Sequence, residues 1–392
     1  MDERRSSESH SENEDVEMTD LLPKQTHEVV HNNDNHDTHR IKNSASAYHY
    51  PMMIRISHMK GPLVFAFVPL FLLGMGILLS QKHRIPSETE FENAKMCSPT
   101  TGECFETPYL PSPRTIYSSW TRDQYLSWYS MHKSLVSRAK VVEADSSYSV
   151  KEDRLPPLML IGDSITEAWA GTKMGIPSDK FIDEPTALAY LSALLDGKYH
   201  SNILVNGISG DQTQHVLYRL NHGELPKNVA HHKKATFVVL IGTNNLGSGH
   251  LPSPTSLGII AVVEYLLNHT NGRVLLMKLL PRGDGKKKLP KLCPPRCGND
   301  GNPFTSFIPA IDKVNDALEE EKSESLSLIV GNAYKDGRLR LKDCGGIFKA
   351  NGEDEEVKQE LLPDLLHPNG EGMKEMARCI SKELLIEDWT TG

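Results

Sequence analysis

The sequence has no excess of positive charge. Its 43 lysine and arginine residues are outnumbered by 51 aspartate and glutamate residues, which gives a net charge of -8. This balance argues against a protein that binds nucleic acids through a basic surface. The short basic run Lys286–Lys288 has no aromatic residue beside it that could stack on bases. We therefore expect a solvated loop there and no nucleic-acid partner.

Cysteine pairs with the two-residue spacing of zinc sites are also missing, and no histidines supply the complementary spacing. We therefore expect no metal site. The six cysteines all lie after residue 96: Cys97, Cys104, Cys293, Cys297, Cys344 and Cys379. An even number suits disulfides in a lumenal or extracellular compartment. The first four form two pairs that are close in sequence, but the full connectivity stays open.

No charged residue occurs between Lys60 and Lys82. As a helix, these 21 residues would span about 31 Å at about 1.5 Å per residue, which matches the hydrocarbon core of a bilayer. A buried core helix would usually show a polar stripe, which this run lacks. A cleaved signal peptide would not follow a long hydrophilic segment. We therefore predict a transmembrane signal anchor at residues 61–81, in contact with the lipid bilayer.

The anchor divides the rest of the chain. Residues 1–60 are acidic and poor in large apolar residues, which predicts a disordered tail. Residues 82–118 contain turn-forming residues typical of a stalk. A slight excess of positive charge before the anchor weakly places the N-terminus in the cytosol. The glycosylation sequon Asn268–Thr270 fits a lumenal or extracellular remainder, so we expect a single-pass type II membrane protein of the secretory pathway.

Residues 119–392 show no internal repeat and alternate between two patterns. Short apolar runs typical of buried strands occur at 157–162, 202–207, 235–242, 272–281 and 326–331. Longer stretches with helical periodicity separate them, and an amphipathic helix is expected over 118–142. Unbroken apolar strands that alternate with helices predict one α/β domain, with a parallel sheet covered on both faces.

Polar clusters follow three of these strands, and a fourth lies before the last predicted helix. Asp163 and Ser164 follow the first run, "GISGDQTQ" follows the second, and Thr243–Asn245 follow the third. Near the C-terminus, "DLLH" places Asp364 and His367 just before a helix. Because ligands bind beyond the carboxyl ends of the strands in open parallel sheets, we expect all four clusters at one edge.

Together these residue types suit nucleophilic catalysis. A serine hydroxyl needs a base, and His367 would accept the proton of Ser164 while Asp364 fixes the imidazole tautomer. The backbone N–H groups of Ser164 and Gly210, with the side-chain amide of Asn244, would be the oxyanion donors. Each residue alone has an ordinary alternative: a helix cap, a turn glycine, a turn asparagine or a helix-start ion pair. Their joint occurrence in this order favours catalysis.

The blocks "GDSI", "GISGD", "GTNN" and "DLLH" resemble the SGNH, or GDSL-type, hydrolase superfamily. Within it, the chain is similar to the catalytic subunits of intracellular platelet-activating-factor acetylhydrolase, on the segments "NGISGDQTQHVLYRLNHGEL", "GTNN", "LLPRG" and "KVN". The resemblance runs from Trp128 to Leu385. It implies a flavodoxin-like three-layer α/β/α fold, the triad and oxyanion donors named above, and hydrolysis through an acyl-enzyme without metal or cofactor.

The sequence departs from the family pattern at several points. Ile165 replaces the leucine of the GDSL name, which a volume-conserving exchange tolerates. Ser209 stands where these relatives tend to have glycine, and the insertion between Arg282 and Phe307 has no counterpart in them. Those relatives are soluble cytosolic proteins, whereas this chain has a predicted anchor. The substrate therefore does not carry over.

We expect a membrane-anchored serine esterase that removes a short acyl group, with acetyl favoured, from a lipid or a glycan. An O-acyltransferase that uses the same triad is the first alternative, because the nucleophilic step is shared. A non-catalytic binding module on a hydrolase fold is the second, and the presence of Ser164, Asp364 and His367 argues against it. A homodimer is left open.

Overall fold

The computed structural model describes residues 106–116, 118–119, 121–151, 154–178, 184–320, 328–350, 356–387 and 389. The predictions that lie outside these residues are the tail 1–60, the anchor 61–81, the stalk up to residue 105, and Cys97 with Cys104. Within the described ranges, no helix combines the length and the apolar character needed to cross a bilayer.

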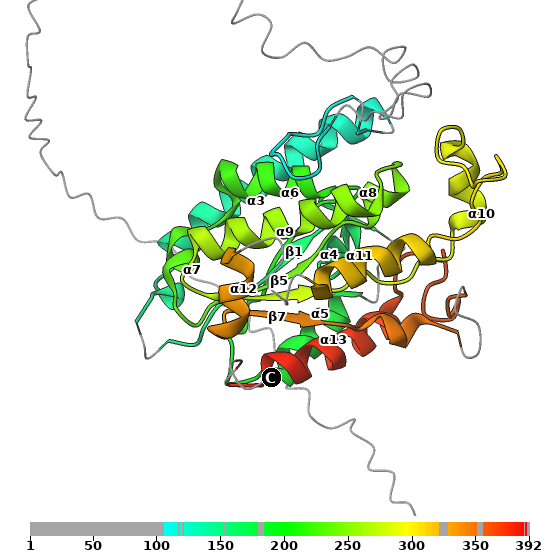
Figure 1. The fold of residues 1–392 in the computed structure, drawn as a ribbon. Coiled ribbons are helices and arrows are strands. Elements are labelled where there is room, and N and C mark those ends of the chain that lie inside the picture. Colours follow the sequence, from blue (N-terminus) through cyan, green and yellow to red (C-terminus); the bar gives the residue numbers. More distant parts are fainter. Residues whose placement is uncertain are drawn as a thin grey trace, which may run out of the picture. The chain divides into compact units, whose positions relative to one another are not determined.

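A five-stranded sheet forms the centre of the described domain (Figure 1). In spatial order the strands are β4 (Leu204–Gly207), β1 (Leu158–Gly162), β5 (Thr236–Leu240), β6 (Arg273–Met277) and β7 (Leu339–Lys342). All neighbouring strands are parallel. In chain order these five strands are arranged 2-1-3-4-5, as in flavodoxin-like sheets. The predicted α/β class with a parallel sheet is confirmed.

Alternate residues of the inner strands face opposite sides of the sheet. In β5, Phe237 and Val239 belong to one hydrophobic core, whereas Val238 and Leu240 belong to another. All four side chains are buried. Because both faces of the strand are apolar, the strand reads in the sequence as a continuous apolar run.

Helices cover both faces of the sheet, so the domain has three layers (Figure 1). The layer on the Phe237 side contains α3 (Arg122–Ala144), α6 (Thr213–Arg219), α7 (Lys227–His231), α8 (Thr243–Gly247), α9 (Pro252–His269), α11 (Ile308–Glu320) and α12 (Leu328–Lys335). The opposite layer contains α4 (Ser164–Ala168), α5 (Glu184–Leu194) and α13 (Gly370–Leu384). Short elements connect them: η2 (Ser146–Tyr148), η4 (Leu220–Glu224), α10 (Gly285–Lys288), η5 (Leu289–Leu292), η7 (Gly345–Phe348) and a hairpin of β2 (Thr172–Lys173) and β3 (Ile176–Pro177).

The prediction of a fifth strand at 326–331 is wrong. The described part of this run begins α12, and the fifth strand is β7. β7 lies at the sheet edge, where Arg340 and Lys342 form ion pairs with Glu383 of α13. An edge strand of this kind carries charges that break the apolar pattern. A short apolar run, in turn, does not distinguish a buried helix from a strand.

The amphipathic helix predicted over 118–142 is α3, which begins at Arg122. Trp128 and Leu135 are buried on its inner face, whereas Tyr125 and Met131 are only half-buried. Trp120, the first aromatic residue of the predicted stripe, lies outside the described residues. The stripe therefore packs on the domain, as its spacing predicts.

The described end of the predicted stalk is part of the domain. Glu106, Arg114 and Ser118 are all buried. Glu106 Oε2 accepts a hydrogen bond from Gln214 Nε2 of α6 at 2.8 Å, and Ser118 Oγ donates to Glu106 Oε1 at 2.8 Å. The described residues between 106 and 119 therefore pack on the domain, because the buried carboxylate of Glu106 finds a partner in α6.

The insertion between Arg282 and Phe307 contains α10 and η5, so the expectation of a loop at Lys286–Lys288 is wrong. A disulfide joins Cys293 to Cys297 inside it. A second disulfide joins Cys344, just before η7, to Cys379 in α13. Disulfide bonding is thereby confirmed for four of the six cysteines.

Loss of the second disulfide should destabilise the domain more than loss of the first. The sequence separations are 35 for Cys344–Cys379 and 4 for Cys293–Cys297, and a longer loop loses more entropy in the unfolded chain. Replacing both cysteines by serine should lower the free energy of unfolding by about 4 kcal/mol for the long loop and about 2 kcal/mol for the short one. Urea unfolding of the two double variants measures both values, and equal losses would contradict the expectation.

Candidate active site

The candidate site lies beyond the carboxyl ends of β1, β4 and β5, where the strand order reverses. Gly207 ends β4 very close to the start of α4. A Cβ atom on Gly207 would lie 2.3 Å from the backbone N of Glu167 and 2.6 Å from the carbonyl O of Asp163. Only glycine therefore allows the loop after β1 to lie against the end of β4.

Asp163 is the N-cap of α4, and Ser164 is the first residue of that helix. Asp163 Oδ1 accepts a hydrogen bond from the Ile165 N–H at 3.0 Å. The capping role considered for Ser164 therefore belongs to Asp163, and the Ser164 side chain is left for other contacts. Burial raises the pKa of Asp163 to about 7, despite the hydrogen bond from Ile165.

Ser164, His367 and Asp364 form one chain of hydrogen bonds. Ser164 Oγ lies 2.8 Å from His367 Nε2, and His367 Nδ1 lies 2.8 Å from Asp364 Oδ2. The other carboxylate oxygen, Oδ1, accepts the backbone N–H groups of Leu366 at 3.1 Å and His367 at 2.7 Å. The two oxygens have different partners, which fixes the rotation of the carboxylate. The structure thus brings together residues that are 203 positions apart in sequence.

The turn that carries Asp364 and His367 contains a strained residue. Leu365 has a φ of +66°, a left-handed conformation that non-glycine residues rarely adopt. Its carbonyl oxygen accepts the N–H of Gly283 at 2.7 Å. On the other side, Asn369 caps α13 by accepting the Gly372 N–H at 3.0 Å. The turn is therefore held at both ends, which keeps the imidazole aimed at Ser164.

Gly210 follows β4 in a left-handed conformation, with a φ of +80°. A Cβ atom there would lie 2.8 Å from Nη2 of Arg114, so both the backbone angle and the space call for glycine. Ser209, just before it, is held by Glu167. Glu167 Oε2 accepts the Ser209 N–H at 2.7 Å and the Ser209 hydroxyl at 2.6 Å. The conformation of the Gly210 loop therefore depends on Glu167.

Glu167 is a positioning residue that the sequence pattern did not reveal. Its side chain is buried, and Oε1 accepts hydrogen bonds from Thr172 Oγ1 at 3.0 Å and the Gly175 N–H at 2.7 Å. The carboxylate thereby joins α4 to the β2–β3 hairpin and to the Ser209 loop. One signal was available: Glu167 is a charged residue three positions after Ser164, in a helix whose other residues are uncharged.

Asn244 lies in α8, directly after β5. Its Nδ2 donates to the carbonyl oxygen of Asp211 at 2.9 Å and to Asp163 Oδ2 at 3.3 Å. The neighbouring Thr243 is held by Arg282, whose Nη1 donates to the Thr243 carbonyl oxygen at 2.9 Å. The amide is therefore oriented from two sides, and the bond to Asp163 is the longer of its two.

A buried charge network fixes the loop between Gly210 and α6. Asp211 accepts hydrogen bonds from Trp128 Nε1 at 2.7 Å and from Arg219 Nε at 2.7 Å. Arg219 also pairs with Glu224 and donates to the carbonyl oxygen of Gly162 at the end of β1. Three residues of "NGISGDQTQHVLYRLNHGEL" therefore support the site through buried contacts: Asp211, Arg219 and Glu224.

A pocket of about 370 Å³ opens at Ser164. Gly210, Asn244 and His367 also line it, so four of the five predicted site residues share this pocket. The fifth, Asp364, contacts His367 and keeps 36% of its side-chain surface exposed. The pocket combines a serine, a histidine base and the side-chain amide of Asn244, which is an arrangement for acyl transfer. Among the described residues, no cluster of three or more His, Cys, Asp or Glu side chains is arranged to hold a metal.

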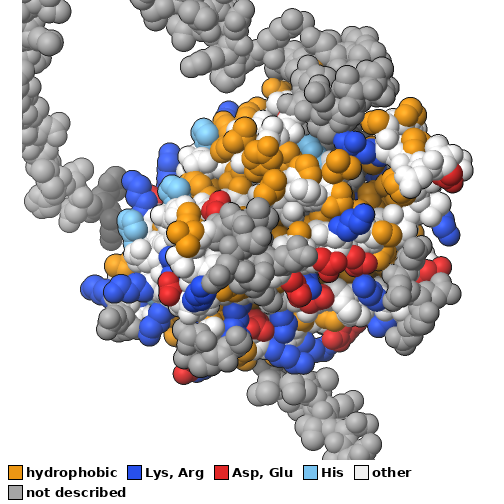
Figure 2. All heavy atoms as spheres, in the orientation of Figure 1, with side chains coloured by type: hydrophobic (Ala, Val, Ile, Leu, Met, Phe, Trp, Pro, Cys, Tyr) orange, Lys and Arg blue, Asp and Glu red, His pale blue; other side chains and the backbone are white. Residues whose placement is uncertain are grey.

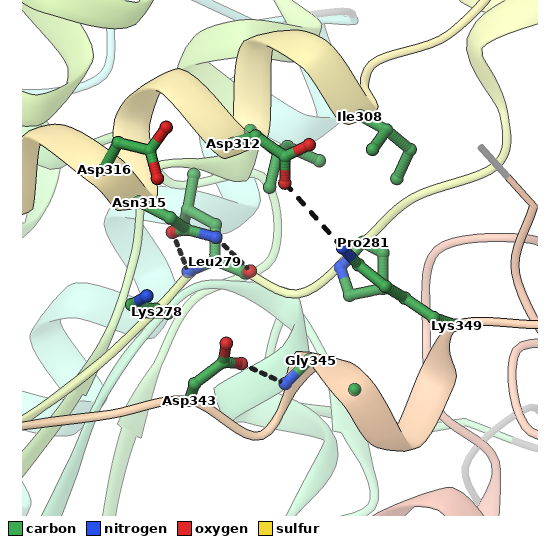
Figure 3. Close-up of a pocket in the computed structure, with 12 residues that line it drawn as sticks. Lys278, Leu279, Pro281, Ile308, Asp312, Asn315, Asp316, Asp343, Gly345 and Lys349 are labelled. Carbon is green, nitrogen blue, oxygen red and sulfur yellow. Dashed lines mark hydrogen bonds and ion pairs between the residues drawn. The ribbon is translucent and has the colours of Figure 1, made fainter. Parts of the chain in front are cut away.

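A second cavity, of about 330 Å³, lies beyond the ends of β6 and β7 (Figure 3). Asn315 accepts the Leu279 N–H at 2.8 Å and donates to the Leu279 carbonyl oxygen at 3.1 Å, which joins "KVN" to "LLPRG". Asp343 accepts the Gly345 N–H at 2.6 Å. No serine, cysteine or histidine occurs among the described residues that line this cavity. Asn315 thereby holds the segment that leads to Arg282.

Comparison with known proteins gives matches in both sequence and structure. The model of the GDSL-like Lipase/Acylhydrolase family matches residues 160–375, which is more than half of the chain. Platelet-activating factor acetylhydrolase IB subunits alpha1 and alpha2 from Homo sapiens are 46% and 38% identical to this chain over 79 residues. This match covers 20% of this chain and 31% and 32% of those proteins, so the chain spans less than a third of the curated relatives' length. A solved acetyl-xylooligosaccharide esterase mutant from Geobacillus is 15% identical, with a TM-score of 0.37 over 59% of this chain and 95% of that one.

Proposed function

This chain belongs to the GDSL-like lipase/acylhydrolase family, and we propose that it is a serine esterase that acts through Ser164, His367 and Asp364. The observation that carries the proposal is the chain of two 2.8 Å hydrogen bonds that links these three side chains. Ser164 and His367 line the same pocket as Gly210 and Asn244, the proposed oxyanion donors. A carboxylic ester hydrolase needs this combination of nucleophile, base and oxyanion donors.

The first half-reaction transfers the acyl group to the enzyme. Ser164 Oγ attacks the ester carbonyl carbon while its proton passes to His367 Nε2, and Asp364 stabilises the imidazolium. The carbonyl oxygen becomes an oxyanion, which the N–H groups of Ser164 and Gly210 and the amide of Asn244 stabilise. The intermediate then expels the alcohol, which takes the proton from His367. In the second half-reaction water repeats these steps and releases the acid.

We further propose that the acyl group is acetyl and that the alcohol belongs to a lipid or a glycan. The names of the curated relatives support the acetyl group, because both are acetylhydrolases. The bilayer contact at residues 61–81 and the homodimer stay predictions.

A labelling and turnover experiment tests the proposal. A fluorophosphonate probe should label the full-length protein, and p-nitrophenyl esters of increasing chain length should show fastest hydrolysis for acetate. Absence of both labelling and turnover would overturn the esterase proposal. The same reaction with a glycan acceptor separates esterase from acyltransferase: free acetate supports the esterase, and an acetylated acceptor supports the transferase.

Asn244→Ala should lower kcat by about 10²- to 10³-fold, because one oxyanion donor is lost. An oxyanion would replace Asp163 as the acceptor of the longer 3.3 Å bond. KM should change little, since the interaction forms mainly in the transition state. Steady-state kinetics with p-nitrophenyl acetate measures both constants. An unchanged kcat would remove Asn244 from the oxyanion site.

We also propose that the catalytic domain lies in the lumen of the secretory pathway or outside the cell. Two disulfides and an exposed sequon residue, Asn268 near the end of α9, support this location. Endoglycosidase treatment of the protein from eukaryotic cells should therefore lower its apparent mass. Asn268→Gln is the control, since this variant should migrate with the treated protein. A cytosolic, unglycosylated product would contradict the proposed topology.

A further inference from the structure

The pocket that contains Ser164 is lined by positive charges. Its lysine and arginine lining residues are Arg114, Lys173, Arg282 and Lys288. No aspartate or glutamate occurs among the described residues that line it. The chain as a whole has a net charge of -8, and charged side chains of both signs are interspersed on the face in Figure 2. The pocket lining therefore differs in charge from the rest of the molecule.

The charge of Arg282 is matched by Asp284. Its Nε and Nη2 donate to the two carboxylate oxygens of Asp284, each at 2.7 Å. The guanidinium also lies over the Phe307 ring, 4.2 Å from its centre. Arg282 therefore serves the structure: it connects the insertion to the Thr243 loop and places α10 beside the pocket.

Lys288 is the last residue of α10 and lines the pocket. Asp284 is the N-cap, and its carbonyl oxygen accepts the N–H groups of Lys287 and Lys288, each at 3.1 Å. Lys288 is half-buried, whereas Lys286 and Lys287 are exposed. The expectation of a solvated loop is therefore wrong for Lys288. Burial and the nearby cation Arg282 lower the pKa of Lys288, against the attraction of Asp284.

Arg114 is buried and incompletely paired. Its Nη2 lies 3.5 Å from Asp211 Oδ1, and its Nη1 donates to the Ser209 carbonyl oxygen at 3.2 Å. Within the described part of the chain, its Nε and Nη2 make no hydrogen bond. Asp211 is shared with Arg219, which binds it at 2.7 Å. Arg219 also pairs with Glu224, so Arg114 contributes N–H groups without a hydrogen-bond partner to the lining, and not an unmatched charge.

Lys173 contributes a further cation from a separate segment. It belongs to β2 and is exposed, and Glu167 holds the hairpin through Thr172 and Gly175. Lys173 and Lys288 thus line the pocket from two elements that are far apart in sequence, β2 and α10. A cationic lining of this kind attracts anions and raises their local concentration.

We propose that this pocket selects esters whose alcohol part carries an anionic group, such as a carboxylate, phosphate or sulfate. Lys173 and Lys288 supply the attraction and determine the preference for the anion, and Arg114 adds N–H donors to the lining. The proposal rests on the proposed esterase function. The anion is assigned to the alcohol part because an acetyl group has no charge.

Matched acetyl esters test this specificity with the full-length protein. The two esters are 4-acetoxyphenylacetate, which carries a carboxylate, and 4-acetoxyphenylacetamide, which carries a neutral amide at the same position. In both, one methylene group separates this substituent from the phenyl ring that bears the acetyl ester. The wild-type protein should show a kcat/KM ratio of about ten in favour of the carboxylate at low salt. The doubly charged 4-acetoxybenzylphosphonate should give a larger ratio. Added salt should reduce both ratios, because it screens the attraction.

Charge-reversal variants assign the effect to particular residues. Lys288→Glu and Lys173→Glu should each lower the anion-to-amide ratio by about tenfold, whereas Lys288→Arg should keep it. Lys286→Glu is the matched control. Lys286 belongs to the same basic run but is exposed and is not among the residues that line the pocket. The anion-to-amide ratio of the Lys286→Glu variant should therefore stay at the wild-type value.

The outcomes separate this inference from the esterase proposal. Hydrolysis of the amide-bearing ester without preference for either anion overturns the anionic-substrate inference and leaves the esterase standing. An equal decrease of the anion-to-amide ratio in Lys286→Glu and Lys288→Glu also overturns it. The preference would then depend on the overall surface charge and not on the pocket lining. Absence of turnover with all three esters overturns both proposals.

Discussion

Ser164→Ala should lower kcat for p-nitrophenyl acetate by about 10⁴- to 10⁶-fold, because no acyl-enzyme can form without the hydroxyl. The residual rate would come from the oxyanion donors and from substrate binding. Ser164 Oγ bonds His367 at 2.8 Å, and loss of such a hydrogen bond costs about 1 kcal/mol of folding free energy. The variant should therefore stay folded, and its thermal unfolding midpoint should fall by only a few degrees.

Ser248→Ala is the control for this experiment. Ser248 lines the same pocket and accepts a hydrogen bond from Gln212 Nε2 at 3.2 Å, whereas Ser164 is the serine whose hydroxyl lies 2.8 Å from His367 Nε2. Its removal should leave kcat close to the wild-type value, and fluorophosphonate labelling should persist. A Ser164→Ala protein that keeps wild-type turnover would show that another group is the nucleophile.

Asp364→Asn should lower kcat by about 10³- to 10⁴-fold without unfolding the domain. Asp364 Oδ1 accepts two backbone N–H groups, from Leu366 and His367, so the amide oxygen of the variant would keep that position. The NH₂ group would then face His367 Nδ1 in place of the carboxylate oxygen. The imidazole would have to carry its proton on Nε2, and it could not accept the proton of Ser164.

Asp343→Asn is the matched control for this prediction. Asp343 follows the edge strand β7. Its Oδ1 accepts the Gly345 N–H at 2.6 Å beside the second cavity. The amide oxygen can keep this bond, so kcat should stay at the wild-type level. Equal losses in the two variants would mean that Asp364 acts through the fold and not through the imidazole.

The central strands could be predicted because they are buried on both faces. The runs that became β1, β4, β5 and β6 are mostly apolar, and each contributes residues to both hydrophobic cores. The edge strand β7 could not, because Arg340 and Lys342 find their counter-charge on α13, far away in the sequence. The apolar pattern therefore predicted the fifth strand at 326–331, where the structure has the start of α12.

The candidate site divides in the same way. Ser164 and His367 could be predicted, because each follows a strand or precedes a helix within a short motif. Glu167 and Arg114 could not, because their importance comes from contacts with Ser209 and Asp211 in another loop. A single buried charged residue produces no periodic pattern in the sequence. Its partner can therefore be identified only from the folded structure, in which the loops lie together.

The sequence by itself predicted the α/β domain with its covered parallel sheet, the edge at which the polar clusters lie, and five candidate catalytic-site residues. The tertiary structure alone decided how that pocket is charged. Lys173 comes from a hairpin held by Glu167, and Lys288 comes from a helix placed by Arg282 and Asp284. The physical reason is that hydrophobic periodicity is local in the chain. The electrostatic character of a pocket is instead the sum of side chains from distant segments.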